Sequence, residues 1–315
     1  LGLNRDKLCR FFEAVEMGYD DSNPYHNRAH AASVVHAMHA LLEHGGLMRA
    51  AAPSLLGQEG CSGKIDDAAN SATLERMACL LAAAVHDYEH EGLNNDFLVK
   101  TGHERAIRYN DQHVNERHHV AAAFGLLLRP ECNFLEHLPA QDFRRVRSLA
   151  IELVLGTDMA QHGKIVQAVG DALDSCPCTE AGVQPESRDE AVLLLQLAMK
   201  CSDLGHLALD WEMHLMWVER LEEEFFRQGD QEKQAEVSVS FMMDRRKPGV
   251  SSSQTGFFDA IVLPLFRVLA RAAPGANPVL AAVEANYGRW MCLKDSPELA
   301  AKPVRQEVLG TPRRR

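Results

Sequence analysis

Several features are missing from this chain of 315 residues, and each absence excludes a class of protein. No apolar run approaches the roughly 18 to 20 residues that a transmembrane helix needs, so we expect no membrane attachment through this domain. No signal peptide is recognisable at the start. The 44 acidic residues outnumber the 33 basic ones, giving a formal charge of -11. That balance argues against nucleic acid as a partner, although a local basic patch is not excluded.

Paired cysteines are also missing. The eight cysteines are scattered, and only Cys176 and Cys178 lie close together. A C-x-C pair is too tight for an ordinary structural disulfide, and nothing resembles the C-x-x-C pairs of a zinc knuckle. Free thiols in a reducing compartment are the simplest account, so we expect a cytoplasmic protein.

The alternation of apolar and polar residues that is typical of β-strands is almost absent, whereas helical periodicity is frequent. The sequence therefore predicts an all-α protein. Apolar stripes at helical spacing predict helices over residues 74–85, 191–204, 211–227 and 257–272. Pro264 should kink the last of them, because proline has no backbone N–H to donate.

Two stretches interrupt this pattern and are predicted to be loops. Residues 49–72 mix small and polar residues with three glycines, and residues 174–188 contain two prolines and a glycine. Neither stretch separates two regimes of composition, so we expect one domain over residues 1–315. Because the chain starts at Leu1 rather than Met, we interpret it as a fragment whose N-terminal regulatory region is absent.

Histidine is abundant, and two of the 15 histidines, His26 and His30, lie four residues apart in the stretch YHNRAH. They could bind one metal together, or they could have separate roles. The apolar helix 74–85 runs directly into His86 and Asp87, and the apolar helix 191–204 ends near Asp203. A buried carboxylate without a partner costs several kcal/mol, which a bound cation would offset. Each residue alone is ordinary, but together they offer the nitrogen and oxygen ligands that zinc or a similar ion prefers.

These residues, in this order, resemble the catalytic domain of class I cyclic nucleotide phosphodiesterases. The stretch YHNRAH is similar to the family's Y-H-N-x-x-H signature, and HDYEHEGLNNDF is similar to its H-D-x-x-H segment with a trailing Asn. Further matches are YNDQHVNERHH, GTDMAQH, EEEFFRQGDQEK and SQTGFFDAIVLPLF. The resemblance extends from about residue 8 to about residue 292.

The resemblance implies a compact all-helical domain of about sixteen helices with two metal ions. The first, usually Zn²⁺, would be bound by His30, His86, Asp87 and Asp203. The second, Mg²⁺ or Mn²⁺, would share Asp87 and be held otherwise through water molecules. The residues near those waters would be His90, Asn95, Glu116, His119 and Thr157.

The resemblance also implies a reaction. A hydroxide bridging the two metals would attack the cyclic phosphate, and His26 would protonate the departing 3′-oxygen, leaving the 5′-monophosphate. His26 must be protonated for this role, so it should lie near a carboxylate. The substrate would be bound by Tyr25, His206, Leu221, Gln254 and Phe257. Among these, Gln254 would hydrogen-bond the purine edge, and Phe257 and Leu221 would hold its two faces.

Two positions of the purine pocket bear on the choice of base: His206, where family members commonly have Asn, Asp, Ala or His, and Val218, where Thr is frequent. We expect cAMP as the main substrate and leave cGMP open as a second one. Two alternatives remain: another His-Asp metallohydrolase acting on a nucleotide monophosphate, and a non-catalytic cyclic nucleotide sensor. A homodimer is also left open.

Overall fold

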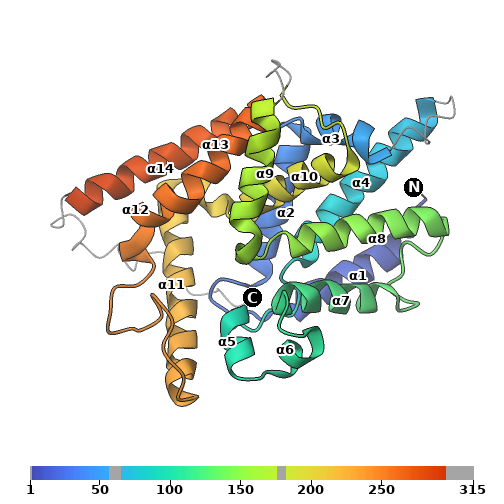
Figure 1. Ribbon diagram of the computed structural model, residues 1–315. Helices are drawn as coiled ribbons and strands as arrows, with labels where there is room; N and C mark the ends of the chain where they lie inside the picture. The colour runs from blue at the N-terminus through green and yellow to red at the C-terminus, as the bar shows by residue number, and fades with distance from the viewer. Residues whose placement is uncertain (1, 57–64, 176–181, 296–315) are drawn as a thin grey trace, which may run out of the picture.

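The computed structural model describes residues 2–56, 65–175 and 182–295 (Figure 1). These residues form helices and connecting turns with no β-strand among them, which confirms the all-α prediction. The expected number of about sixteen helices is close to the observed set of α-helices. The α-helices are α1 (Arg5–Gly18), α2 (Arg28–Glu43), α3 (Leu47–Leu56), α4 (Ile65–Val85), α5 (Asn95–Lys100), α6 (Glu104–Tyr109), α7 (Val114–Leu127), α8 (Ala140–Leu155), α9 (His162–Ser175), α10 (Arg188–Asp203), α11 (Trp211–Gln234), α12 (Gln254–Phe257), α13 (Leu263–Ala272) and α14 (Asn277–Asp295).

Short segments connect several of these helices. Four are 3-10 turns and one, η5, is a π-helix. They are η2 (Met159–Gln161), η3 (Gly205–Ala208), η4 (Ser251–Ser253), η5 (Phe258–Val262) and η6 (Pro274–Ala276).

The helices α2, α4 and α10 pack against one another at the centre of the fold. In Figure 1, α5 to α8 lie on one side of this centre, and α11 to α14 lie on the other. A single cluster of buried apolar side chains extends from Phe11 in α1 to Trp290 in α14. The central helices therefore bring segments from the two sides together, and their ends carry the polar residues described below.

The start of α2 is set by Asn27, which is the N-cap of the helix. The Asn27 side chain accepts hydrogen bonds from the backbone N–H groups of Ala29 (3.0 Å) and His30 (3.3 Å). These N–H groups have no partner inside the helix, so the cap satisfies them. His30 is thereby held in the first turn of α2, with its imidazole directed by a defined helix start.

The helix α10 is buried over most of the segment predicted from the sequence. It begins after Ser187, whose side chain accepts from the Glu190 N–H (3.2 Å), and it ends at Asp203. Between these ends, Leu194, Leu195 and Leu197 are buried, as the apolar stripe predicts. The helix thus places a carboxylate in the interior at the end of a largely apolar segment.

The prediction of a loop over residues 49–72 is wrong. The helix α3 covers residues up to Leu56, and α4 begins at Ile65, nine residues before the predicted start. The alanine-rich stretches on either side of the three glycines have good helix propensity, so helices continue to Leu56 and resume at Ile65. The glycines themselves lie at 57, 60 and 63, outside the described residues.

The second predicted loop, 174–188, agrees with the structure over residues 182–187, whereas its ends at 174–175 and 188 belong to helices. The helix α9 ends at Ser175, residues 182–187 are not helical, and α10 begins at Arg188. The remainder of that stretch, residues 176–181, lies outside the described residues.

The predicted helix 257–272 is divided near Pro264. The π-helical segment Phe258–Val262 immediately precedes α13, which has this proline in its first turn. A proline removes one helical hydrogen bond and crowds the preceding turn, which is the usual cause of such an irregularity. Within the described residues, none of the helices has the length and apolar character that would allow it to span a membrane.

Candidate active site

Two imidazoles and two carboxylates converge at the centre of the fold. The donor atoms of His30, His86, Asp87 and Asp203 all lie within 4.8 Å of one another. His30 Nε2 is 3.2 Å from His86 Nε2 and 3.1 Å from Asp203 Oδ1. His86 Nε2 is 3.0 Å from Asp87 Oδ2. We refer to these four side chains as the central cluster.

The hydrogen bonds around the central cluster favour a cation between its donor atoms. His86 Nδ1 donates to the Ala83 carbonyl (2.9 Å), so in a neutral ring Nε2 carries a lone pair toward the cluster. Asp87 Oδ2 is buried and accepts no hydrogen bond of good geometry, although His86 Nε2 lies 3.0 Å from it. Two nitrogens and a carboxylate oxygen in such proximity repel one another unless a proton or a metal ion lies among them. The donor set therefore fits a divalent metal ion.

The ends of two helices add to this preference for positive charge. Asp203 ends α10, and His86 and Asp87 follow the end of α4, so both C-terminal helix dipoles present their negative ends. The two imidazoles are shielded from solvent, with 3% of the His30 side chain and 0% of the His86 side chain exposed. The carboxylates are more open, at 13% for Asp87 and 23% for Asp203. A ligand can therefore approach the cluster only from its carboxylate side.

A second group of donors adjoins the central cluster. Asp87, His90 and His119 place one donor atom each within 4.8 Å of one another. His119 Nδ1 donates to the Tyr88 carbonyl (2.6 Å), and its Nε2 is buried without a partner. Burial holds the pKa of His119 well below its usual range, so Nε2 is a free acceptor. Burial and the nearby charge of His26 lower the pKa of His90 to about 3.

The other predicted neighbours of the second metal are Asn95, Glu116 and Thr157, and the first two are hydrogen-bonded to each other. Asn95 Nδ2 donates to both carboxylate oxygens of Glu116, at 3.3 and 3.0 Å. Burial, followed by the charge of Asp158, raises the pKa of Glu116 to about 7. Thr157 is buried, and its hydroxyl donates to the Val154 carbonyl (2.8 Å), which leaves the oxygen free to accept.

His26 does not belong to the central cluster. Its Nδ1 forms an ion pair with Glu224 Oε1. Glu224 Oε2 also accepts from the backbone N–H groups of Tyr25 (2.9 Å) and His26 (3.0 Å). Burial alone lowers the pKa of His26, but the charge and hydrogen bond of Glu224 together with the charges of Asp87 and Asp203 outweigh it and raise the pKa to about 9. His26 is therefore protonated at neutral pH, and 22% of its side chain is exposed.

Glu224 is a site residue that the sequence reasoning did not name, although it expected a carboxylate beside His26. Three consecutive glutamates, 222–224, made the choice ambiguous. Helical periodicity offered a signal, because position 224 lies three residues after Leu221 and seven after Trp217, on the inward face of α11. Glu224 is 3% exposed there, and its pKa is lowered to about 2, because His26 and the backbone donors outweigh the opposing effect of burial.

The predicted purine pocket is bordered by a chain of three aromatic side chains. Trp290 Nε1 donates to His214 Nε2 (2.8 Å), so a neutral His214 carries its proton on Nδ1. That atom faces His206 Nδ1 at 3.3 Å. Burial lowers the pKa of His206 well below its usual range and that of His214 to about 4, so both rings are neutral. The chain therefore places the His206 proton on Nε2, which makes that atom a donor. The sequence did not predict that His214 and Trp290 set the tautomer of His206.

The remaining pocket residues lie on adjoining elements. Gln254 is buried, its Nε2 donates to the Val250 carbonyl (3.2 Å), and its Oε1 has no partner. Phe257, one turn later, is partly buried, as is Leu221 on α11. The Tyr25 ring lies 4.7 Å from the His30 ring and 5.9 Å from the His206 ring. Tyr25 thus lies between the central cluster and the predicted purine pocket.

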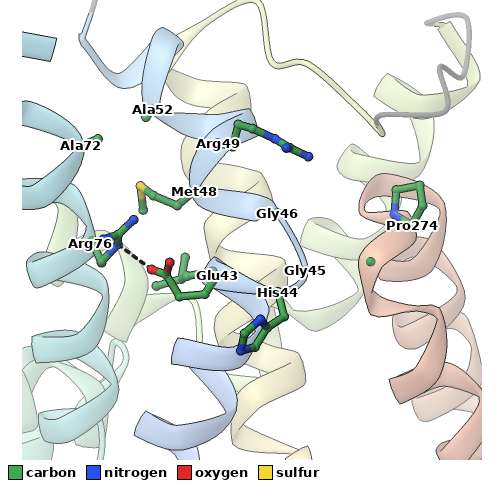
Figure 2. Close-up of a pocket in the computed structure, with 12 residues that line it drawn as sticks. Glu43, His44, Gly45, Gly46, Met48, Arg49, Ala52, Ala72, Arg76 and Pro274 are labelled. Carbon is green, nitrogen blue, oxygen red and sulfur yellow. Dashed lines mark ion pairs between the residues drawn. The ribbon is translucent and has the colours of Figure 1, made fainter. Parts of the chain in front are cut away.

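A separate cavity of about 420 Å³ lies at the other end of α2. Figure 2 shows the Glu43–Arg76 ion pair (2.7 Å) on one side of it and Arg49 extending across it. His44, at this end of α2, is 14 residues from His30, which corresponds to about 21 Å along a helix. None of the central cluster lines this cavity.

The fold and the cluster define a helical protein with a histidine–aspartate centre for a divalent metal. The model of the 3′5′-cyclic nucleotide phosphodiesterase family matches residues 25–283. The chain belongs to this family.

Characterised relatives support the same assignment. A dual specificity calcium/calmodulin-dependent 3′,5′-cyclic nucleotide phosphodiesterase 1C from Mus musculus is 39% identical over 265 residues, covering 83% of this chain and 33% of the mouse protein. The corresponding phosphodiesterase 1 from Drosophila melanogaster is 40% identical over 263 residues, covering 83% of this chain and 28% of the fly protein. The chain thus spans about a third of the length of these relatives.

Solved structures show a similar fold. The phosphodiesterase domain of the Salpingoeca rosetta rhodopsin phosphodiesterase superposes with a TM-score of 0.79 at 28% identity. The match covers 95% of this chain and 83% of that domain. The similarity in three dimensions therefore includes nearly all of the helices described above.

Proposed function

We propose that this chain hydrolyses 3′,5′-cyclic nucleotides to 5′-monophosphates, with cAMP as the main substrate and cGMP as a second one. The observation that supports this most directly is the pairing of the central cluster with a separate, protonated His26. A metal centre alone suits many hydrolases. A metal centre with a buried carboxylate that keeps a neighbouring imidazole charged suits cleavage of a phosphoester whose leaving oxygen needs a proton.

The metals in the proposal are Zn²⁺ at His30, His86, Asp87 and Asp203, and Mg²⁺ or Mn²⁺ beside Asp87. When bound, such ions neutralise phosphate charge and lower the pKa of a bound water. The neutral His119 Nε2, the Glu116 carboxylate and the Thr157 oxygen are all acceptors, which suits them to orient water molecules around the second ion.

His26 has the role of general acid. As the attacking oxygen bonds to phosphorus, the bond from phosphorus to the 3′-oxygen breaks and its electron pair stays on that oxygen. His26 then delivers the proton from Nε2, because its Nδ1 is held by Glu224. Such proton transfer typically contributes about 10²- to 10⁴-fold to the rate.

The pocket residues support the choice of bases. The Gln254 amide must direct Nε2 to the Val250 carbonyl, so the unpartnered Oε1 is the atom left for the substrate. An acceptor there pairs with the 6-amino group of adenine. His206 Nε2, as a donor, can pair with the 6-oxygen of guanine. Phe257 can stack on either base, a contact typically worth about 1 to 3 kcal/mol.

A cytoplasmic location is part of the proposal, and every cysteine within the described residues is a free thiol. Free thiols are usual in a reducing compartment.

The experiment that tests the function is a comparison of kcat/KM for cAMP and cGMP, with and without a chelator. We expect hydrolysis of both, loss on chelation and recovery on adding back Zn²⁺ and Mg²⁺. AMP is included as a substrate to test for a nucleotide monophosphate hydrolase. Tight binding of cyclic nucleotide without turnover would favour a sensor, and no hydrolysis of either cyclic nucleotide would refute the proposal.

A further inference from the structure

One buried cation on α10 has no part in the proposed chemistry. Lys200 is 2% exposed, although lysine is almost never fully buried without a partner. Its Nζ donates to three backbone carbonyls, those of Gly156 (3.2 Å), Thr157 (3.1 Å) and Asp158 (3.4 Å). An ammonium group has three protons to donate, so all of its hydrogen-bonding capacity is directed to one turn of the backbone.

That turn follows the end of α8. The last carbonyls of a helix and those just beyond it lack partners within the helix, and they carry the negative end of its dipole. Lys200 supplies both donors and positive charge to this end from a neighbouring helix. Burial lowers the pKa of Lys200, but the carboxylates of Asp203 and Asp158 oppose this effect. The lysine therefore links α10 to residues 156–158, which we call the α8 turn.

The α8 turn is linked to the proposed second-metal site in two ways. Thr157 lies within the turn and has a free acceptor on its hydroxyl. Asp158 Oδ2 forms an ion pair with His113 Nδ1 at 2.7 Å. His113 immediately precedes α7, whose first turn carries Glu116. A movement of the α8 turn would therefore displace acceptors on both α7 and the turn.

We propose that Lys200 is a positioning residue for the second-metal site, an inference that rests on the proposed function. Lys200 lies three residues before Asp203, so the two side chains are neighbours on one face of α10. Asp203 belongs to the central cluster, whereas Lys200 holds the α8 turn. Through this arrangement α10 sets the distance between the first-metal ligands and the water-binding acceptors of the second metal.

This role and a simple charge effect predict opposite results. If Lys200 acted only through its charge, removing it would strengthen binding of a divalent cation nearby, because like charges repel. If Lys200 positions the α8 turn, removing it weakens binding, because the acceptors are no longer held in place. Loss of a group that orients metal ligands typically costs about 10- to 100-fold in metal affinity.

The test compares Lys200→Met with Gln196→Met as a matched control. Gln196 lies one helical turn earlier on α10, and its Nε2 donates to the Glu152 carbonyl of α8 (2.7 Å). Both substitutions thus remove side-chain hydrogen bonds from α10 to the α8 segment. Gln196 also lies against Gly156, but only Lys200→Met removes hydrogen bonds to the carbonyls of the α8 turn. The affinity for Mn²⁺ is measured by electron paramagnetic resonance on zinc-loaded protein without substrate. Zinc content and amide hydrogen exchange at residues 157–160 are measured on the same samples.

We expect Lys200→Met to raise the Kd for Mn²⁺ about 10-fold or more and to speed exchange in the α8 turn, with zinc content unchanged. Gln196→Met should change the Kd less than about 2-fold. Unchanged or tighter Mn²⁺ binding by folded Lys200→Met protein overturns the inference. If that variant does not fold, Lys200→Gln, which retains an amide donor, is subject to the same criterion. Failure of the unsubstituted protein to bind Mn²⁺ or hydrolyse cyclic nucleotide would instead refute the proposed function, and this inference with it.

Discussion

Substituting Glu224 with Gln tests the link between one buried carboxylate and acid catalysis. Glu224 is the largest of the influences that raise the pKa of His26, and burial opposes it. Without the carboxylate charge, the pKa should fall from about 9 toward the ordinary value of 6.5, with Asp87 and Asp203 still raising it and burial still lowering it. With a pKa near 6.5, the protonated fraction of His26 at pH 8 would drop from about 90% to about 3%. Since only the protonated form can donate to the leaving oxygen, kcat/KM at pH 8 should fall by up to about 30-fold.

The assay is the pH profile of kcat/KM for cAMP between pH 6 and pH 10, with zinc content measured in parallel. The unsubstituted protein should lose activity as the pH rises through about 9, where His26 loses its proton. In Glu224→Gln the same decline should occur at a lower pH, toward about 6.5, so the loss shrinks as the pH is lowered toward 6. Glu223→Gln is the control, because it removes the same charge from the adjacent residue, which pairs with Arg245 (2.7 Å) at the surface. We expect that control to remain within about 2-fold at every pH.

A deficit of the same size at pH 6 and pH 8 would refute this reasoning. It would mean that Glu224 acts by holding the backbone of Tyr25 and His26 rather than by holding a proton on the ring. A loss of zinc in Glu224→Gln would also contradict it, because His26 lies outside the central cluster.

Three further substitutions test other parts of the site. Asp203→Ala should abolish turnover and reduce zinc content while circular dichroism shows an intact fold; normal hydrolysis by the folded, metal-depleted variant would disprove the metal assignment. His26→Asn should lower kcat about 10²- to 10⁴-fold with metal content preserved; if the variant instead loses its metal, His26 is a ligand. Trp290→Phe frees the tautomer of His214 and should change the ratio of kcat/KM for cGMP over cAMP up to about 10-fold, as expected for one hydrogen bond. Trp211→Phe is the control, because the Trp211 ring packs beside the Trp290 ring. Equal ratios of kcat/KM for cGMP over cAMP in the two variants would exclude the proposed chain of hydrogen bonds.

The helical class and the main helices could be predicted from the sequence, because an apolar stripe records locally which face of a helix is buried. Residues 191–204 illustrate this, since nearly every apolar side chain there is inside the core. The prediction was wrong where small residues had no stripe, as in 49–72, because alanine-rich segments have helix propensity without a strong pattern. The start of α4 was predicted less accurately than its interior, because its first residues carry no apolar stripe.

The central cluster could be predicted from the sequence, but the residue that supports the α8 turn could not. The residue types and their order along the chain, together with the family resemblance, predict His30, His86, Asp87 and Asp203 as one group, and these side chains lie together. Their roles as ligands stay a proposal. Lys200 was not anticipated, because a lysine at the end of an apolar helix is expected to extend to solvent.

The amino-acid sequence by itself determined the helices, the apolar interior and the placement of carboxylates at two helix ends, because these depend on residues close together in the chain. The tertiary structure decided which groups meet. His26 and His30 share one stretch, YHNRAH, yet His26 pairs with Glu224, 198 residues away, and His30 contacts Asp203, 173 residues away. No local pattern records a contact over such a separation, because it depends on how α2, α10 and α11 pack. Helix packing therefore separates two neighbouring histidines into a protonated group and a member of the central cluster.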